Sequence, residues 1–214
     1  MIKYEKLGIF LSKPIALLFV LVYLLQSVFI VLLVQDKFDL EKQIDFQQKR
    51  ITELEEKLKI LQVIEDFQIG FTDKEEAELA EVISSECNRY DYDPLFLLSL
   101  ILTESSFRNY QVSSRGAEGL MQIRPLTGRS LAGKIGVDWK GEQTLRQPEL
   151  NIRMGSLHLF ELILKFKDVR KALISYNLGE TELKSRMSLN KPLPKLFLDK
   201  VMNNYEMLKE RYTI

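Results

Sequence analysis

The sequence has only one cysteine, Cys87, and one histidine, His158, among its 214 residues. A lone cysteine excludes an intramolecular disulfide, and these two residues are too few for a Cys/His zinc cluster. One cysteine and one histidine are enough for a Cys–His nucleophile pair, but no recognisable motif surrounds Cys87. We therefore interpret Cys87 as a small buried apolar residue and His158 as a surface or packed residue of a helix. No metal is expected.

An excess of charge of either sign is also lacking, because 30 Lys and Arg residues balance 30 Asp and Glu residues. Electrostatic binding to phosphates therefore has no support, and no nucleic-acid partner is expected. Internal repeats and low-complexity tracts are absent as well, so nothing indicates a repeat architecture. The length allows one ordinary globular domain plus additional segments.

Residues 15–34 form a run without charge that is almost entirely apolar. About 20 such residues are needed to cross the hydrocarbon core of a bilayer, so this run predicts a transmembrane anchor. Lys3, Lys6 and Lys13 precede it, which predicts a cytoplasmic segment over residues 1–14 and the remainder outside. A cleaved signal peptide is the alternative, but the run is long for one and no Ala-x-Ala-like site ends it.

Residues 35–69 are expected to form a helical stalk, since positions 36–66 are charged and contain no Gly or Pro. Apolar residues fall there on alternating three- and four-residue steps, with Gln47 interrupting: Leu40, Ile44, Ile51, Leu54, Leu58 and Leu61. About three heptads of this kind are typical of a coiled coil that forms a homodimer or holds the next domain away from the membrane. An amphipathic helix that packs on the chain's own globular domain explains the pattern equally well.

Residues 70–214 are expected to form a mostly α-helical domain. The pattern of apolar residues and breakers predicts helices over 73–90, 94–105, 118–132, 149–166, 168–177 and 194–211. Loops with Gly and Pro are expected over 106–117, 133–148 and 178–193. Thr72 and Glu75 have the spacing of a capping box, which indicates where the first of these helices begins. No alternating run typical of a strand is present.

Glu104 ends a strongly apolar run that opens after Asp93 and Pro94, a typical helix start. Burial disfavours the ionised form of a carboxyl and can raise its pKa toward neutrality, as a general acid requires. The alternative is a Glu on the solvent-facing side of a core helix. This fragment alone favours the alternative, because catalytic carboxylates are far rarer than surface ones.

Four separated motifs lie in order along this domain. They are T-E-S-S-F-R from Thr103, G-A-E-G-L-M-Q-I from Gly116, N-I-R-M-G from Asn151 and A-L-I-S-Y-N-L-G from Ala172. Together they resemble the lytic transglycosylase domain of the soluble-lytic-transglycosylase type, which is similar to goose-type lysozyme. The resemblance covers roughly residues 75–185 and implies a lysozyme-like helical fold.

The resemblance implies a lyase of the cell wall that cleaves the β-1,4 bond between N-acetylmuramic acid and N-acetylglucosamine in peptidoglycan. Glu104 would act first as acid and then as base on the sugar's own 6-hydroxyl, which closes a 1,6-anhydro ring without any cofactor. Ser113 and Gln122 are expected to hydrogen-bond the sugar, Tyr176 to orient it, and Asn177 to contact substrate or fix the loop. The resemblance and the anchor together place the catalytic domain on the periplasmic side of the inner membrane.

Several motif residues are interpreted as structural. Leu120, Met121 and Ile123 are expected in the core. Phe107 should pack beneath the site, and Asn151 should cap the helix that follows it. Glu118 occupies a variable position of its motif and is expected to be exposed.

The sequence departs from the family pattern at three positions. Arg124 stands where a methionine is frequent, and it either meets acidic groups of peptidoglycan or points to solvent. His158 stands where an aromatic residue is common, and Leu178 replaces a small residue. A lysozyme-like hydrolase and a non-catalytic glycan-binding scaffold remain the alternative functions.

Overall fold

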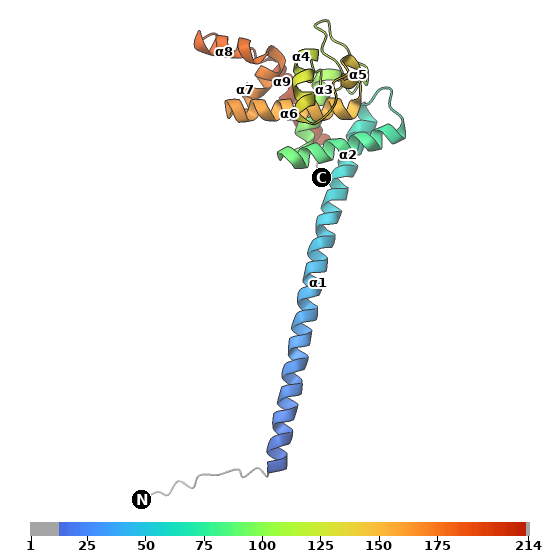
Figure 1. Ribbon diagram of the computed structural model, residues 1–214, viewed down its shortest axis with the longest axis vertical. Helices are drawn as coiled ribbons and strands as arrows, with labels where there is room; N and C mark the ends of the chain where they lie inside the picture. The colour runs from blue at the N-terminus through green and yellow to red at the C-terminus, as the bar shows by residue number, and fades with distance from the viewer. Residues whose placement is uncertain (1–12, 213–214) are drawn as a thin grey trace, which may run out of the picture. The chain divides into compact units, whose positions relative to one another are not determined.

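The computed structural model describes residues 13–212, and the chain divides into two compact units, Met1–Glu53 and Leu54–Ile214. Over the described residues it contains nine α-helices and no strand (Figure 1). The prediction of a mostly α-helical protein is therefore confirmed. Helix α1 (Lys13–Phe67) begins in the first unit and ends in the second.

The described part of the first unit consists of α1 alone. The large apolar side chains between Ile15 and Val34 are exposed, and α1 contains a stretch long and apolar enough to cross a membrane. So many exposed apolar side chains are unfavourable in water and favourable in an apolar medium such as a bilayer. The anchor expected over 15–34 lies inside this helix, whereas nearly all of the segment expected in the cytoplasm lies outside the described residues.

Five of the six heptad residues of α1 are exposed, among them Leu54 and Leu58 of the second unit, and Leu61 is partly buried. Leu40, Ile44 and Ile51 are exposed in the first unit. In the second unit, the last turns of α1 carry buried residues at other positions: Ile60, Val63 and Ile64. The end of α1 therefore packs into the core of the second unit, and the predicted homodimer stays a prediction.

Eight helices follow α1 in the second unit. They are α2 (Asp73–Tyr90), α3 (Pro94–Ser105), α4 (Pro125–Lys134), α5 (Glu142–Leu145), α6 (Pro148–Phe166), α7 (Val169–Leu178), α8 (Glu180–Ser188) and α9 (Leu196–Tyr212). Two of them, α5 and α8, lie in segments expected to be loops. The helix expected over 118–132 begins only at Pro125, because the preceding residues form a tight turn.

The local start signals are confirmed. The Thr72 hydroxyl accepts the Glu75 N–H at 3.4 Å, and the Glu75 carboxylate accepts the Thr72 N–H at 2.9 Å. The Asp93 carboxylate accepts the Leu95 N–H at 2.8 Å and so caps α3 ahead of Pro94. Both caps satisfy N–H groups that a helix cannot bond internally.

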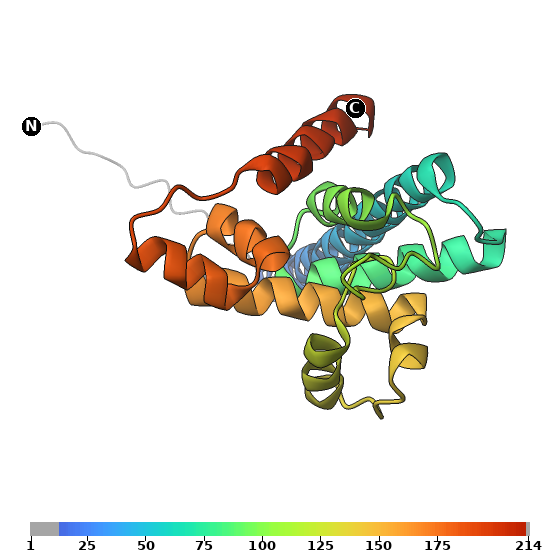
Figure 2. The ribbon, with the colours of Figure 1, turned by 90° about the horizontal axis from the view of Figure 1, so that it is seen from above.

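Helix α3 is the buried centre of the domain. It packs against α9, while α6 packs against both α2 and α7, and Figure 2 shows α2 and α6 side by side. Leu97, Leu98, Leu100 and Ile101 are fully buried, and each contributes about 1.5–3 kcal/mol of transfer free energy. This burial fixes α3 and therefore the position of its last turn.

Candidate active site

Glu104 lies in the last turn of α3, one residue before the helix ends. The next residue but one, Ser106, adopts a left-handed conformation (φ 53°) and its N–H bonds to the Leu102 carbonyl, which terminates the helix. Glu104 is partly buried, between the buried Thr103 and Ser105. A rigid helix thus holds the carboxyl at the edge of the core.

The carboxyl of Glu104 is largely buried. Burial raises its pKa from the ordinary value of 4.5 to about 8, and the charge of Lys200 on α9 offsets this only in part. Among residues 13–212, no hydrogen bond or ion pair to this carboxyl is formed. A carboxyl with such a pKa carries a proton near neutral pH, as a general acid must.

Glu104 opens into a cavity of about 450 Å³. The cavity is lined by Glu104, Ser113, Ser114, Arg115, Ala117, Gln122, Ile123, Arg124, Thr127, His158, Ser175, Tyr176, Asn177, Gly179 and Glu180. All five residues expected in the site, Glu104, Ser113, Gln122, Tyr176 and Asn177, are among them. Segments far apart in the sequence therefore converge where the motifs led us to expect a site, and the roles of the five residues stay predictions.

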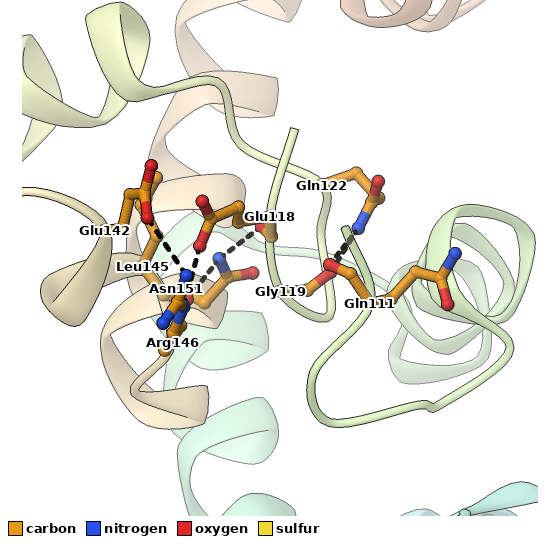
Figure 3. Close-up of polar contacts among 8 residues, drawn as sticks. All are labelled: Gln111, Glu118, Gly119, Gln122, Glu142, Leu145, Arg146 and Asn151. Carbon is orange, nitrogen blue, oxygen red and sulfur yellow. Dashed lines mark hydrogen bonds and ion pairs between the residues drawn. The ribbon is translucent and has the colours of Figure 1, made fainter. Parts of the chain in front are cut away.

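The side-chain amide of Gln122 supports the loop over residues 116–123, which contains Gly116 and Gly119. Its Nε2 donates to the carbonyls of Gln111 and Gly119, both at 2.9 Å (Figure 3). Its own backbone is left-handed, with φ 49°, a conformation that is uncommon outside glycine. The Nε2 group of Gln122 is thus used within the protein, and its Oε1 atom is available to accept a hydrogen bond from a ligand.

Gly119 is required where it stands. Its φ is +81°, and a Cβ there would lie 2.2 Å from Asn151 Nδ2 and 2.7 Å from the Leu145 carbonyl oxygen. Any other residue would displace the backbone of the loop. The glycine therefore allows Asn151 to approach the chain that carries Gln122.

Asn151 holds this loop and does not cap a helix, so the predicted capping role was wrong. It lies inside α6 and is fully buried. Its Oδ1 accepts the Met121 N–H at 2.7 Å, and its Nδ2 donates to the carbonyls of Glu118 and Leu145 at 2.8 and 2.9 Å. One side chain thus satisfies three backbone groups from two other segments.

Glu118 is buried, with 3% of its surface exposed, so the prediction of an exposed residue was wrong. Its carboxylate lies 3.2 Å from Nε of Arg146, whose guanidinium also contacts Glu142 at 2.9 Å (Figure 3). A buried carboxylate requires such a partner because desolvation is costly. Glu118 therefore anchors the loop, and it does not line the cavity.

Tyr176 lines the cavity and is bonded to the loop beside it. Its hydroxyl donates to the Met121 carbonyl at 2.8 Å, and its ring lies 5.1 Å from the ring of His158 at an angle of 45°. Burial and the nearby Glu104 raise the pKa of Tyr176 well above its ordinary value. The phenol is thus a neutral donor that is used within the protein.

The core residues of the motifs are buried as the sequence indicated, and the sugar-binding role of Ser113 stays a prediction. The Ser113 hydroxyl accepts the Ala117 N–H at 2.9 Å, which leaves its own proton for another partner. Phe107 is fully buried, as are Leu120 and Met121, and Ile123 is 2% exposed. Gly155 makes room for Met121, since a Cβ there would lie 2.4 Å from the methionine sulfur.

Ser175 is a cavity residue that sequence reasoning missed. It is 2% exposed, and its hydroxyl has no hydrogen-bond partner within the described part of the chain. Its position directly before Tyr176 is the one sequence feature that indicates a place in the site. Lys200 was missed too, because only the packing of α9 against α3 brings it near Glu104.

Comparisons with known proteins identify the family of this domain. Residues 81–195, just over half of the chain, match the model of the transglycosylase SLT domain family. The transglycosylase of Enterobacteria phage PRD1 is 32% identical over 128 residues, which are 60% of this chain and 43% of that protein. Endo-type membrane-bound lytic murein transglycosylase A of Klebsiella pneumoniae is 41% identical over 71 residues, 31% of this chain and 34% of that one.

A solved structure supports the fold. A lytic transglycosylase, an inactive mutant of Slt from Pseudomonas aeruginosa, superposes with a TM-score of 0.53 at 20% identity, over 61% of this chain and 24% of that one. The chain thus spans less than half the length of each of these three relatives. Because the family model covers the helices that hold Glu104 and Tyr176 together with the loop between them, the chain belongs to the transglycosylase SLT domain family.

Proposed function

We propose that this protein is a membrane-anchored lytic transglycosylase of peptidoglycan. It cleaves the β-1,4 bond between N-acetylmuramic acid and N-acetylglucosamine and leaves 1,6-anhydro ends. The observation that carries the proposal is a carboxyl with a pKa of about 8 that opens into the cavity formed by the family's motifs. The similarity to the phage and Klebsiella proteins, both transglycosylases, supports it.

In the first step Glu104 donates its proton to the oxygen of the glycosidic bond. The bond between this oxygen and C1 of the muramic sugar breaks, and the 2-acetamido group of the same sugar supports the cationic centre. Because the carboxyl lacks an internal hydrogen-bond partner, its proton is available to the substrate. Partial burial keeps the proton on Glu104 near neutral pH.

In the second step Glu104, now a carboxylate, takes the proton of the sugar's own 6-hydroxyl. The oxygen O6 forms a bond to C1, and Glu104 regains the proton that it gave away. No water is consumed, so the product is lighter by one water than the product of hydrolysis. One carboxyl with a pKa near the working pH serves both steps.

The other carboxylates near the site favour this one-carboxyl scheme. Ordinary glycosidases use a second carboxylate as nucleophile or base. Glu118 is bound to Arg146 outside the cavity lining. Glu180 lines the cavity, but Lys165 and Lys184 bind it at 2.5 and 2.6 Å and lower its pKa. A carboxylate held in this way is a poor base.

The remaining site residues bind and position the sugar in this proposal. Ser113 donates its hydroxyl proton, and Gln122 offers its oxygen as an acceptor. Tyr176 presents its ring to an apolar sugar face. Asn177 is exposed at the cavity wall and can both donate and accept.

The first unit supplies the location in this proposal. The apolar part of α1 crosses the inner membrane once, and the lysines before it keep the N-terminus in the cytoplasm. The catalytic domain then faces peptidoglycan. A reporter fused after Ile214 that is active only in the cytoplasm would contradict this orientation.

The homodimer through residues 36–66 is part of the proposal. Leu40, Ile44 and Ile51 are exposed apolar residues at heptad positions, so a second copy could bury them. Replacing Ile44 by Glu should convert a dimer to a monomer in analytical ultracentrifugation of the full chain in detergent. A parent protein that sediments as a monomer at all concentrations would contradict this part of the proposal.

Digestion of purified sacculi by the Glu104→Gln variant tests the activity. We expect a loss of at least about a hundredfold, the contribution of a general acid, and anhydro-ended products from the parent in mass spectrometry. The matched control is Glu210→Gln, at an exposed glutamate outside the cavity. Full activity of the Glu104 variant would exclude a catalytic role. Exclusively reducing ends would indicate a hydrolase.

A further inference from the structure

Two arginines line the cavity and have no partner in the part of the chain that the structure describes. Arg115 precedes the glycine block, and Arg124 precedes α4. Both are exposed, and neither forms an ion pair or a hydrogen bond within residues 13–212. Arg146 and Arg153, by contrast, each contact two carboxylates.

The backbone fixes Arg124 at the cavity wall. The residue before a proline is restricted to extended conformations, and Arg124, before Pro125, has φ −76° and ψ 145°. Its side chain makes no capping bond to α4 and is therefore free to meet a ligand. Arg115 lies on the other side of the glycine block, so two separate positions of the chain carry cations to one cavity.

Over residues 13–212, the cavity lining has no free negative charge to balance them. Glu104 is protonated near neutral pH because of its burial. Glu180 is bound by Lys165 and Lys184. The lining therefore carries an excess of positive charge that attracts carboxylates.

We propose that Arg115 and Arg124 bind carboxylates of the glycan substrate and so select strands that contain muramic acid. This inference rests on the proposed function and names the substrate feature that its site recognises. A guanidinium suits a carboxylate because its planar donors match the two oxygens. The carboxylate belongs either to the lactyl group of a strand without peptides or to the stem peptide.

The two arginines act on binding and leave the reaction itself unchanged. The positive charge of Lys200 lowers the pKa of Glu104, whereas neither arginine affects this pKa. Loss of either one should therefore raise KM, while kcat and the pH profile stay the same. A merely structural role would disturb these quantities together.

Direct binding separates this inference from the proposed activity. The Glu104→Gln variant of the full chain in detergent serves as the parent, because it should hold strands without cleaving them. Three soluble probes of equal length are compared by fluorescence anisotropy. They are an N-acetylglucosamine oligomer without carboxylates, a glycan strand stripped of peptides, and a strand that bears stem peptides.

We expect Arg115→Met and Arg124→Met each to weaken binding of carboxylate-bearing strands by about fivefold, the size of a well-formed exposed ion pair. Binding of the uncharged oligomer should not change. Arg129→Met, at an exposed arginine of α4 outside the cavity, is the matched control and should bind all probes like the parent. Arg124→Lys should retain part of the affinity, since the charge remains.

The pattern of loss identifies the carboxylate. A loss already seen on the stripped strand supports the lactyl group, and a loss confined to the peptide-bearing strand supports the stem peptide. No loss on either strand, or an equal loss on all three probes, overturns the inference without affecting the role of Glu104. A parent variant that binds no probe contradicts both the inference and the proposed function.

Discussion

Replacing Glu104 by Gln should stabilise the folded protein at alkaline pH. The carboxyl ionises near 4.5 in the unfolded chain, whereas burial raises its pKa to about 8 in the folded domain. Between these two pH values the folded state binds more protons than the unfolded state, so stability falls as pH rises. Glutamine has nearly the same shape and does not ionise, so the variant should escape this loss.

The size of the effect follows from the same two values. The rise from 4.5 to about 8 corresponds to about 5 kcal/mol, at about 1.36 kcal/mol for each pKa unit. The carboxyl borders an open cavity, where water screens its charge, so we expect about 2–4 kcal/mol. The difference should be close to zero below about pH 4, grow toward pH 8, and then level off.

Urea denaturation of the full chain in detergent between about pH 4 and pH 9 measures this difference. Glu210→Gln, outside the cavity on α9, is the control, and its difference from the parent should stay flat. A Glu104→Gln difference that is equally flat would refute the reasoning. So would a variant that becomes less stable than the parent as pH rises.

Three further outcomes are expected. The kcat for sacculi, followed by turbidity, should fall about tenfold per pH unit above pH 8, because ionised Glu104 cannot donate a proton; a constant rate up to pH 10 would contradict its role as acid. Asn151→Ala should lower the free energy of unfolding by about 3–5 kcal/mol, since it leaves the Met121 N–H and two carbonyls unpaired; a loss below about 1 kcal/mol in urea denaturation speaks against this anchoring role. Ser175→Ala should raise stability by about 1 kcal/mol by removing a buried hydroxyl without a partner; a lower Tm is the contrary result.

The helices with local start signals could be predicted to the residue. Thr72 with Glu75, and Asp93 with Pro94, specify helix starts through contacts only two or three residues apart. The apolar run that follows Pro94 also made the central position of α3 predictable. Helix α8 could not be predicted from the apolar pattern. Leu183 is its one buried residue, and a single apolar position has no periodicity.

The segment from Glu118 to Arg124 was misjudged because distant residues determine its structure. Arg146 pairs with Glu118, and Asn151 bonds to both Glu118 and Met121 from about 30 positions away in sequence. Apolar residues at 120, 121 and 123 resemble a helix face when read alone. The long-range bonds and the left-handed Gln122 override that tendency and produce a turn.

Which residues would gather at the site could be predicted from the motifs, but which of their atoms are free could not. The amide of Gln122 is used by the carbonyls of Gln111 and Gly119, and the hydroxyl of Tyr176 by the carbonyl of Met121. These are donors in the cavity that Glu104 also lines. A hydrogen bond from either one to the carboxylate would stabilise its charge and lower its pKa. The backbone carbonyls that hold these donors therefore help to keep Glu104 without a partner among the described residues, as the proposed acid step requires.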